Sequence, residues 1–155
     1  MKSIIVSFKF GGVTGLAPFL VDGFVEHRAK AMKELGECTL VPIPLHPSRE
    51  YQRGYNQAAL LARQLGRKLG LPVNETILER KLSRRPQAKL KSRYRARNIK
   101  GVFSVDAEEV SELKGKKVVL VDDVVTSGAT IGEAASVLDE SGQTVVAALA
   151  MAHGL

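Results

Sequence analysis

Apolar and polar positions along this chain alternate between helical spacing and short apolar runs. Helical spacing predicts a helix from Leu16 to Leu35 and another that begins at Asn56 and ends near Leu69. A short helix or a turn is expected over 108–113, and a helix over 129–141. Short runs of apolar and β-branched residues predict strands at 39–43, 77–82, 99–105, 117–121 and 144–151. Strands and helices therefore follow one another along the chain.

This alternation predicts an α/β fold, with a mostly parallel sheet flanked by helices. The run 117–121 is almost wholly Val and Leu, which is typical of a central strand buried on both faces. Pro44, Pro47 and Gly54 predict a loop over 44–54, and the polar, basic stretch 83–98 predicts an exposed loop. The length of 155 residues indicates a single domain over 1–155.

Positive charge is concentrated in one part of the chain. The formal net charge is +7 and the pI is about 9.7, which implies an anionic partner. The stretch from Arg80 to Lys100 is rich in Arg and Lys and contains no acidic residue, whereas the rest of the chain is close to balanced. The basic character is therefore local and needs a local explanation.

Cysteine content and hydropathy exclude several classes of protein. A single cysteine, Cys38, rules out an internal disulfide, and the sequence has no Cys/His cluster that could hold zinc. The early apolar run 4–6 is too short for a signal-peptide core or a membrane span. We therefore expect a cytoplasmic protein without a membrane partner.

The segment after the strand at 117–121 has the residue types of a sugar-phosphate site. It reads Asp122, Asp123, Val124, Val125, Thr126, Ser127, Gly128, Ala129 and Thr130. Ligands of open α/β sheets bind outside the carboxyl ends of strands, and a helix that begins there offers free N–H groups to an anion. The glycine lets the backbone approach that anion, and the hydroxyl groups add donors. The two acids would repel a phosphate but accept hydrogen bonds from sugar hydroxyls, so a ribose 5-phosphate fits.

Each feature of this segment also has a plain structural explanation. Two aspartates after a strand often form a solvated turn, and Ser or Thr before a helix often serves as a cap. The complete order of residue types in the strand and the segment after it is more specific than any one of these features. It resembles the signature that binds 5-phosphoribosyl-1-pyrophosphate (PRPP) in type I phosphoribosyltransferases: an apolar strand, two acids, two aliphatics and Thr-Ser-Gly-Ala-Thr. The GxxxxGK[ST] and GxGxxG patterns are absent from the sequence, which argues against a nucleoside triphosphatase and a dinucleotide enzyme.

A wider resemblance, from about Lys9 to Met151, is to the competence protein F (ComF) family of phosphoribosyltransferase-like proteins. It rests on Lys-Phe-Gly-Gly at 9–12, Val-Pro-Ile-Pro-Leu-His-Pro at 41–47, Arg-Gly-Tyr-Asn-Gln-Ala at 53–58, Arg-Arg-Pro-Gln at 84–87, Arg-Asn at 97–98 and Gly-Val-Phe at 101–103. Longer members carry an N-terminal zinc ribbon with cysteine pairs, which this sequence lacks. Either this is a short member or that segment is missing from it.

The resemblance implies a type I phosphoribosyltransferase fold, in which about 1–38 and 144–155 contribute a hood or flanking elements. It also implies roles for single residues. Asp122 and Asp123 would hold the ribose hydroxyls and would support magnesium, directly or through water. The segment from Thr126 to Thr130 would hold the 5-phosphate, with Val124 also in the site. Pyrophosphate would meet the loop after the first strand, including Leu45, His46 and Arg53.

The basic stretch matches the position of the flexible catalytic loop in such enzymes. Arg84, Arg85, Arg93 and Arg97 would grip the pyrophosphate, because guanidinium groups bind phosphate oxygens in pairs, and a closed loop would exclude water. The implied reaction is displacement of pyrophosphate from the anomeric carbon by a nitrogen acceptor, with the acids stabilising positive charge on the sugar. No general base can be named. His46 is a candidate, although a histidine in such a loop is more often a turn residue.

Two other classes of function stay open at this point. The first is binding of single-stranded DNA or of the competence machinery, because Tyr94 lies within the basic run and aromatic rings between cations suit single strands. The second is a non-catalytic regulator that binds PRPP without turnover. The sequence fixes neither the acceptor nor the oligomeric state, with a homodimer among the alternatives.

Overall fold

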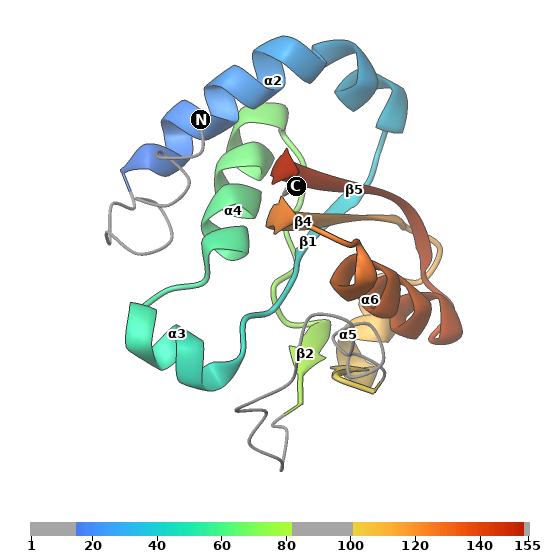
Figure 1. Cartoon of the computed structure of the whole chain (residues 1–155). Helices are drawn as coiled ribbons and strands as arrows, with labels where there is room; N and C mark the ends of the chain where they lie inside the picture. The colour runs from blue at the N-terminus through green and yellow to red at the C-terminus, as the bar shows by residue number, and fades with distance from the viewer. Residues whose placement is uncertain (1–14, 82–100, 154–155) are drawn as a thin grey trace.

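Helices cover both faces of a small parallel sheet in this protein (Figure 1). The computed structural model describes residues 15–81 and 101–153. In chain order the elements are α2 (Leu16–Leu35), β1 (Thr39–Pro42), α3 (Pro47–Arg53), α4 (Gln57–Leu69), β2 (Leu78–Arg80), β3 (Phe103–Val105), α5 (Ala107–Glu112), β4 (Lys117–Val125), α6 (Ala129–Glu140) and β5 (Thr144–His153). The predicted α/β class is confirmed.

The central sheet has the strand order β1-β4-β5, and both of its strand pairs are parallel. The register pairs Thr39 with Val118 and Pro42 with Val121. After α4 the chain returns beside β1, where the Asn74 N–H donates to the Leu40 carbonyl at 2.9 Å. Because the strands are parallel, the carboxyl ends of β1 and β4 lie at the same edge of the sheet.

Side chains of β4 alternate between two hydrophobic cores, one on each face of the sheet. Val119 and Val121 pack in a core that α2 and α4 complete. Val118 and Leu120 pack on the opposite face, in a core to which α6 and the β2–β3 pair contribute. All four of these side chains are fully buried. Because side chains of a strand alternate between its two faces, each later residue of β4 can be assigned to one of the two cores' sides of the sheet.

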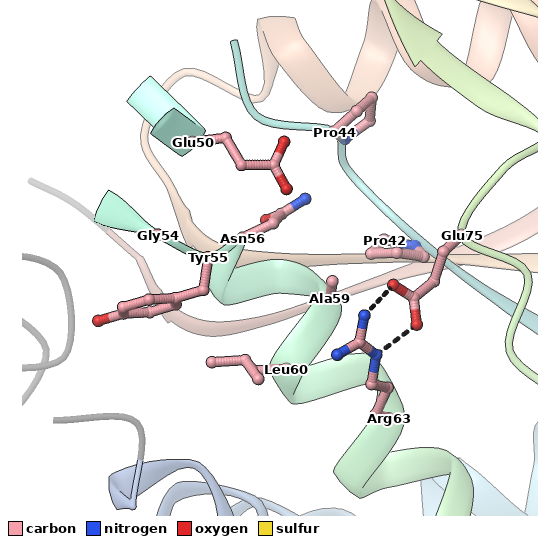
Figure 2. Close-up of a pocket in the computed structure, with 10 residues that line it drawn as sticks. All are labelled: Pro42, Pro44, Glu50, Gly54, Tyr55, Asn56, Ala59, Leu60, Arg63 and Glu75. Carbon is pink, nitrogen blue, oxygen red and sulfur yellow. Dashed lines mark hydrogen bonds and ion pairs between the residues drawn. The ribbon is translucent and has the colours of Figure 1, made fainter. Parts of the chain in front are cut away.

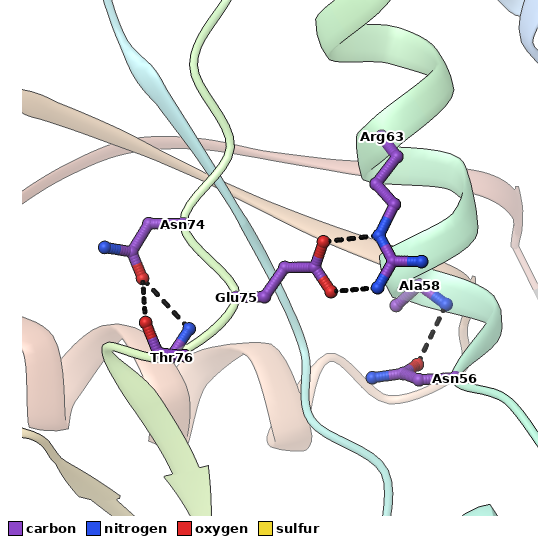
Figure 3. Close-up of polar contacts among 6 residues, drawn as sticks. All are labelled: Asn56, Ala58, Arg63, Asn74, Glu75 and Thr76. Carbon is purple, nitrogen blue, oxygen red and sulfur yellow. Dashed lines mark hydrogen bonds and ion pairs between the residues drawn. The ribbon is translucent and has the colours of Figure 1, made fainter.

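The second sheet is an antiparallel pair of β2 and β3, in which Arg80 lies opposite Phe103. A further bond, from the Lys81 N–H to the Val102 carbonyl at 2.8 Å, continues this ladder. The turn before β2 is fixed by Asn74, whose side-chain oxygen accepts from the backbone N–H of Thr76 at 3.0 Å (Figure 3). It also accepts from the Ile77 N–H at 2.8 Å. This pair of strands is therefore attached firmly to the core that contains Leu120.

The structure confirms most of the predicted helices and strands. The strands expected over 77–82 and 99–105 are shorter, with β2 at Leu78–Arg80 and β3 at Phe103–Val105, and residues 82, 99 and 100 lie outside the described residues. Larger differences occur at two places. The predicted loop over 44–54 is wrong, because it contains α3: Pro47 occupies the first turn, the His46 side chain caps the helix and Gly54 ends it with φ +77°. The strand expected over 117–121 continues to Val125, since Val124 and Val125 still pair with β5. The loop predicted over 83–98 lies outside the described residues.

The two segments expected to form a hood or flanking elements have different places in the fold. Within the first, α2 flanks the sheet and buries Ala17 and Val21 in the core shared with α4. Within the second, residues 144–153 form β5, a strand of the central sheet itself. None of the helices in the described part of the chain is both long and apolar enough to cross a membrane.

Two glycines within helices give a matched test of the packing. A Cβ on Gly66 of α4 would lie 2.6 Å from Val73 Cγ2 and 2.8 Å from the Leu71 carbonyl oxygen, whereas a Cβ on Gly132 of α6 meets nothing within 4 Å. We expect Gly66→Ala to lower the free energy of unfolding by about 1–3 kcal/mol through overpacking. Gly132→Ala should raise it by about 0.5–1 kcal/mol, because alanine is the better helix former. Urea unfolding measures both, and equal effects of the two changes would contradict the close approach at Gly66.

Candidate functional site

The two acids at the end of β4 lie on opposite faces of the sheet. Asp122 follows the alternation of Leu120 and points to the side of α6, whereas Asp123 follows Val121 and points to the side of α4. Both are half-buried, and the Asp123 N–H donates to Asp122 Oδ1 at 2.8 Å. The strand predicted to end at Val121 therefore continues through both acids, because pairing with β5 keeps this part of the chain extended.

The turn after β4 presents backbone N–H groups at the start of α6. Gly128 has φ +73° and precedes the helix, a conformation that strains residues with a Cβ. The Ala129 N–H donates to Ser127 Oγ at 3.4 Å, no side chain caps Gly128, and the first turn of α6 has no acidic residue. Thr126 and Ser127 are exposed, and Thr130 is half-buried. These features are those of an anion-binding helix start.

The loop after β1 reaches the same edge of the sheet. The Ile43 N–H donates to the Val121 carbonyl at 2.8 Å, which holds this loop beside the residue that precedes Asp122. Leu45 and His46 follow and are half-buried. The structure therefore brings the two segments singled out in the sequence, 44–47 and 122–130, to the carboxyl ends of adjacent strands.

His46 and Arg53 both make contacts that organise this loop. His46 Nδ1 accepts from the Ser48 N–H at 3.3 Å and lies 2.7 Å from Ser48 Oγ, so it caps α3. This contact matches the interpretation of His46 as a turn residue. Arg53 donates from Nη1 to Gln57 Oε1 at 3.2 Å and thereby links α3 to α4.

Sequence reasoning missed two arginines, Arg80 and Arg49. Arg80 ends β2, and its guanidinium carbon lies 5.5 Å from the centre of the Phe103 ring. Burial lowers the pKa of Arg80, the like charge of Arg49 lowers it further, and the charge of Asp122 acts in the opposite direction. The sequence signal was present, since Arg80 opens the acid-free basic run, but the run alone did not distinguish this arginine from its neighbours.

A polar cavity of about 260 Å³ lies between α3, α4 and the end of β1 (Figure 2). Arg63 and Glu75 face each other across one side of it, with Arg63 Nε and Nη2 donating to the Glu75 carboxylate at 2.5 and 2.6 Å (Figures 2 and 3). Asn56 stands on another side and bonds to both the Ile43 carbonyl and the Ala58 N–H. The Arg63 charge is thus neutralised, and Asn56 connects the cavity to the loop after β1.

Several of the predicted site residues cannot be placed. Arg84, Arg85, Arg93 and Arg97, expected to bind pyrophosphate, lie outside the described residues, as does Tyr94. Within 15–81 and 101–153, no three His, Cys, Asp or Glu side chains gather closely enough to hold a metal ion. Magnesium binding by Asp122 and Asp123 therefore stays a prediction.

Comparison with known proteins decides the family. Residues 53–154 match the family described as "Phosphoribosyl transferase domain", a range that contains β4, the turn and α6. The chain belongs to this family. Together with the parallel sheet between helices, the match confirms the predicted type I phosphoribosyltransferase fold.

Curated relatives of this phosphoribosyl transferase domain confirm the resemblance to the ComF family. Competence protein F of Haemophilus influenzae is 39% identical over 103 residues, which is 66% of this chain and 44% of that protein. DNA utilization protein YhgH of Escherichia coli K12 is 35% identical, over 69% of this chain and 45% of that protein. Competence protein ComFC of Bacillus subtilis is 32% identical, over 92% of this chain and 55% of that protein. The chain thus spans about half the length of these relatives.

Among solved structures, orotate phosphoribosyltransferase from Aeropyrum pernix is similar in part. It covers 88% of this chain and 56% of its own chain at 19% identity, with a TM-score of 0.45. A likeness of this degree adds nothing to the family match.

Asn56 gives a test of how the loop after β1 is held. Its amide nitrogen donates to the Ile43 carbonyl at 3.1 Å, and its side-chain oxygen accepts from the Ala58 N–H at 3.0 Å as the cap of α4. We expect Asn56→Ala to lower the free energy of unfolding by about 2–3 kcal/mol, because both bonds are lost. Asn56→Ser keeps a cap acceptor and should cost about 1 kcal/mol. Chemical denaturation compares them: equal losses would show that the cap adds no stability, and an Asn56→Ser variant as stable as the unmodified protein would show that the bond to Ile43 adds none.

Proposed function

We propose that this domain binds PRPP at the carboxyl edge of β1 and β4 and transfers its phosphoribosyl group to a nitrogen acceptor with release of pyrophosphate. One observation supports the proposal above all. In a chain of the phosphoribosyl transferase family, the carboxylates at the end of β4 are followed at once by a helix start with exposed hydroxyls and no acid. Sugar hydroxyls donate to carboxylates, and a phosphate binds at a helix start without acids, so a sugar phosphate needs the two side by side.

In this proposal each segment has one task. Asp122 and Asp123 accept hydrogen bonds from the ribose hydroxyls, and the N–H groups and hydroxyls from Thr126 to Thr130 bind the 5-phosphate. Gly128, with φ +73°, immediately precedes α6 and lets the backbone approach a phosphate closely. The loop with Leu45 and His46 meets the pyrophosphate.

The carboxylates suit a magnesium ion that arrives with the ligand. Magnesium in such sites is held by one or two carboxylates together with phosphate oxygens and water, so a pair of aspartates is sufficient. When bound, the ion neutralises the pyrophosphate as it leaves. Asp122 and Asp123 then hold the sugar in place and stabilise the positive charge that develops on its ring as the bond to pyrophosphate breaks.

Ligand-induced stabilisation tests this function. We expect magnesium and PRPP to raise the unfolding temperature by roughly 5–10 °C at about 100 times the dissociation constant, since binding to the folded state alone stabilises it. The double variant Asp122→Asn/Asp123→Asn should show little shift, and each single variant should show part of it. Differential scanning fluorimetry measures the shifts, and a pyrophosphate-release assay with nucleobases, amines and ammonia then searches for the acceptor.

Asp22→Asn is the matched control, because Asp22 is an exposed aspartate of α2 that pairs with Lys68. It should respond to PRPP like the unmodified chain. Equal shifts in the unmodified protein and the double variant would remove the two aspartates from the site. Binding without pyrophosphate release from any acceptor would favour the PRPP-binding regulator over the enzyme.

A second candidate function is binding of single-stranded nucleic acid. The supporting observation is α3, which has no buried residue and carries Tyr51, 92% exposed, two positions from both Arg49 and Arg53. Exposed rings beside arginines can stack on bases, and relatives named for competence and DNA utilization agree with this class. Salt-dependent binding of an oligonucleotide that Tyr51→Ala weakens, and that saturating magnesium and PRPP leave intact, would favour it. A homodimer and a cytoplasmic location remain predictions.

A further inference from the structure

The cavity between α3, α4 and the end of β1 is not used by the proposed function (Figure 2). Its volume of about 260 Å³ exceeds that of an engineered apolar cavity of about 150 Å³ that holds benzene, so a small organic molecule fits. The lining also includes polar groups whose charge or hydrogen-bonding capacity is not satisfied. The chemistry of this lining therefore defines the class of ligand that the cavity would bind.

Part of the lining is apolar. Pro42 and Ala59 are buried, and Pro44 and Leu60 are half-buried. Pockets for small molecules combine such surfaces with a few polar groups, which fix the orientation of the ligand. These four residues would contact the apolar part of a ligand.

Arg63 offers a hydrogen-bond donor to the cavity. Its Nε and Nη2 donate to Glu75, which raises the pKa of Arg63, and the ion pair has no net charge. Its third nitrogen, Nη1, has no hydrogen-bond partner among the residues that the structure describes. In Figure 2 it is the nitrogen without a dashed line, on the side of Leu60. Because the charge of Arg63 is already balanced, Nη1 suits a neutral acceptor such as a carbonyl oxygen.

Glu50 supplies a charge that is not balanced. Its carboxylate lies between Asn56 and Pro44 (Figure 2), and it forms no ion pair with the described residues. A glutamate in the first turn of a helix also stabilises that helix, so its presence alone does not indicate a site. The composition of the lining adds the second observation. With Glu50, Glu75 and Arg63, the cavity has two acids and one base, although the protein has a net charge of +7.

We propose that this cavity binds a small organic monocation that has an apolar body and a neutral hydrogen-bond acceptor. The cationic group pairs with Glu50, and the acceptor receives a hydrogen bond from Arg63 Nη1. The apolar body packs against Ala59 and Leu60. Asn56 lines the same cavity and bonds to the Ile43 carbonyl, so the ligand lies beside the side chain that holds the loop after β1. The inference goes beyond the proposed function and does not require PRPP to bind.

Three probes of nearly equal size test each part of this class. L-leucinamide is a monocation with an apolar side chain and an amide carbonyl, 4-methylpentanamide is the same molecule without the amine, and L-leucine has a carboxylate in place of the amide. We expect L-leucinamide to bind about three- to fivefold more tightly than 4-methylpentanamide at low ionic strength, the size of effect given by a solvent-exposed ion pair. L-leucine should also bind more weakly, because its carboxylate adds negative charge to a lining that already has an excess. Titrations followed by two-dimensional amide NMR measure the affinities and show where each probe binds.

Glu50→Gln should weaken L-leucinamide about three- to fivefold and leave 4-methylpentanamide unchanged. The matched control is Glu108→Gln, since Glu108 is also an exposed glutamate in the first turn of a short helix but does not line the cavity. It should leave the affinity of both probes unchanged. Ala59→Leu fills the cavity and should abolish binding of both probes. Should Ala59→Leu fail to fold, Glu50→Gln on the surface still decides the question.

The position of the NMR changes separates this site from the proposed PRPP site. L-leucinamide should shift the amides of Gly54, Asn56 and Leu60 and leave those of 126–130 in place, and Asp122→Asn/Asp123→Asn should bind it like the unmodified chain. The proposal is overturned if the unmodified protein does not bind L-leucinamide, if 4-methylpentanamide binds equally well, or if Glu50→Gln has no more effect than Glu108→Gln. Changes at 126–130 in place of those at the cavity would also overturn it. Failure of PRPP to bind leaves the cavity proposal standing and removes only the proposed function.

Discussion

Parallel pairing of β1 with β4 is the constraint on which the candidate site depends. The register of Pro42 with Val121 makes both strands end at one edge, and the Ile43 N–H bond to the Val121 carbonyl carries the pairing one residue further. An antiparallel pair would put the loop after β1 and the turn after β4 at opposite ends of the sheet. The parallel pair instead places the loop after β1 and the turn after β4 at the same edge of the sheet.

The alternation of a strand then divides the chemistry of that edge between two faces. Asp122 shares its face with α6, Arg80 and Phe103, whereas Asp123 shares its face with α4. Positive charge and the start of α6 thus lie on the Asp122 side, which suits phosphoryl groups. A sugar bound over the end of the strand contacts both faces at once, so adjacent acids can serve one ligand although they point apart.

Much of this arrangement could be predicted from the sequence, and the parts that could not have a physical reason. Apolar runs such as 117–121 and caps such as Asn56 are local signals, so most of the helices and strands were predicted correctly. The continuation of β4 through Asp122 and Asp123 depends on pairing with β5, which no local pattern reveals. Helix α3 was missed because Pro47 and Gly54 were interpreted as loop signals, whereas they begin and end a short helix.

Arg80 shows most clearly what a linear sequence cannot reveal. In the sequence it is one member of a basic run, and each member of such a run is usually solvated. In the fold it lies opposite Phe103 and is partly buried, with a donor that the described residues leave unsatisfied. A chain under selection for stability alone would place an apolar residue on that ring, because the free protein would then avoid both desolvation of the guanidinium and its repulsion from Arg49. The buried Nε is therefore a feature of this face of the sheet that packing alone does not explain.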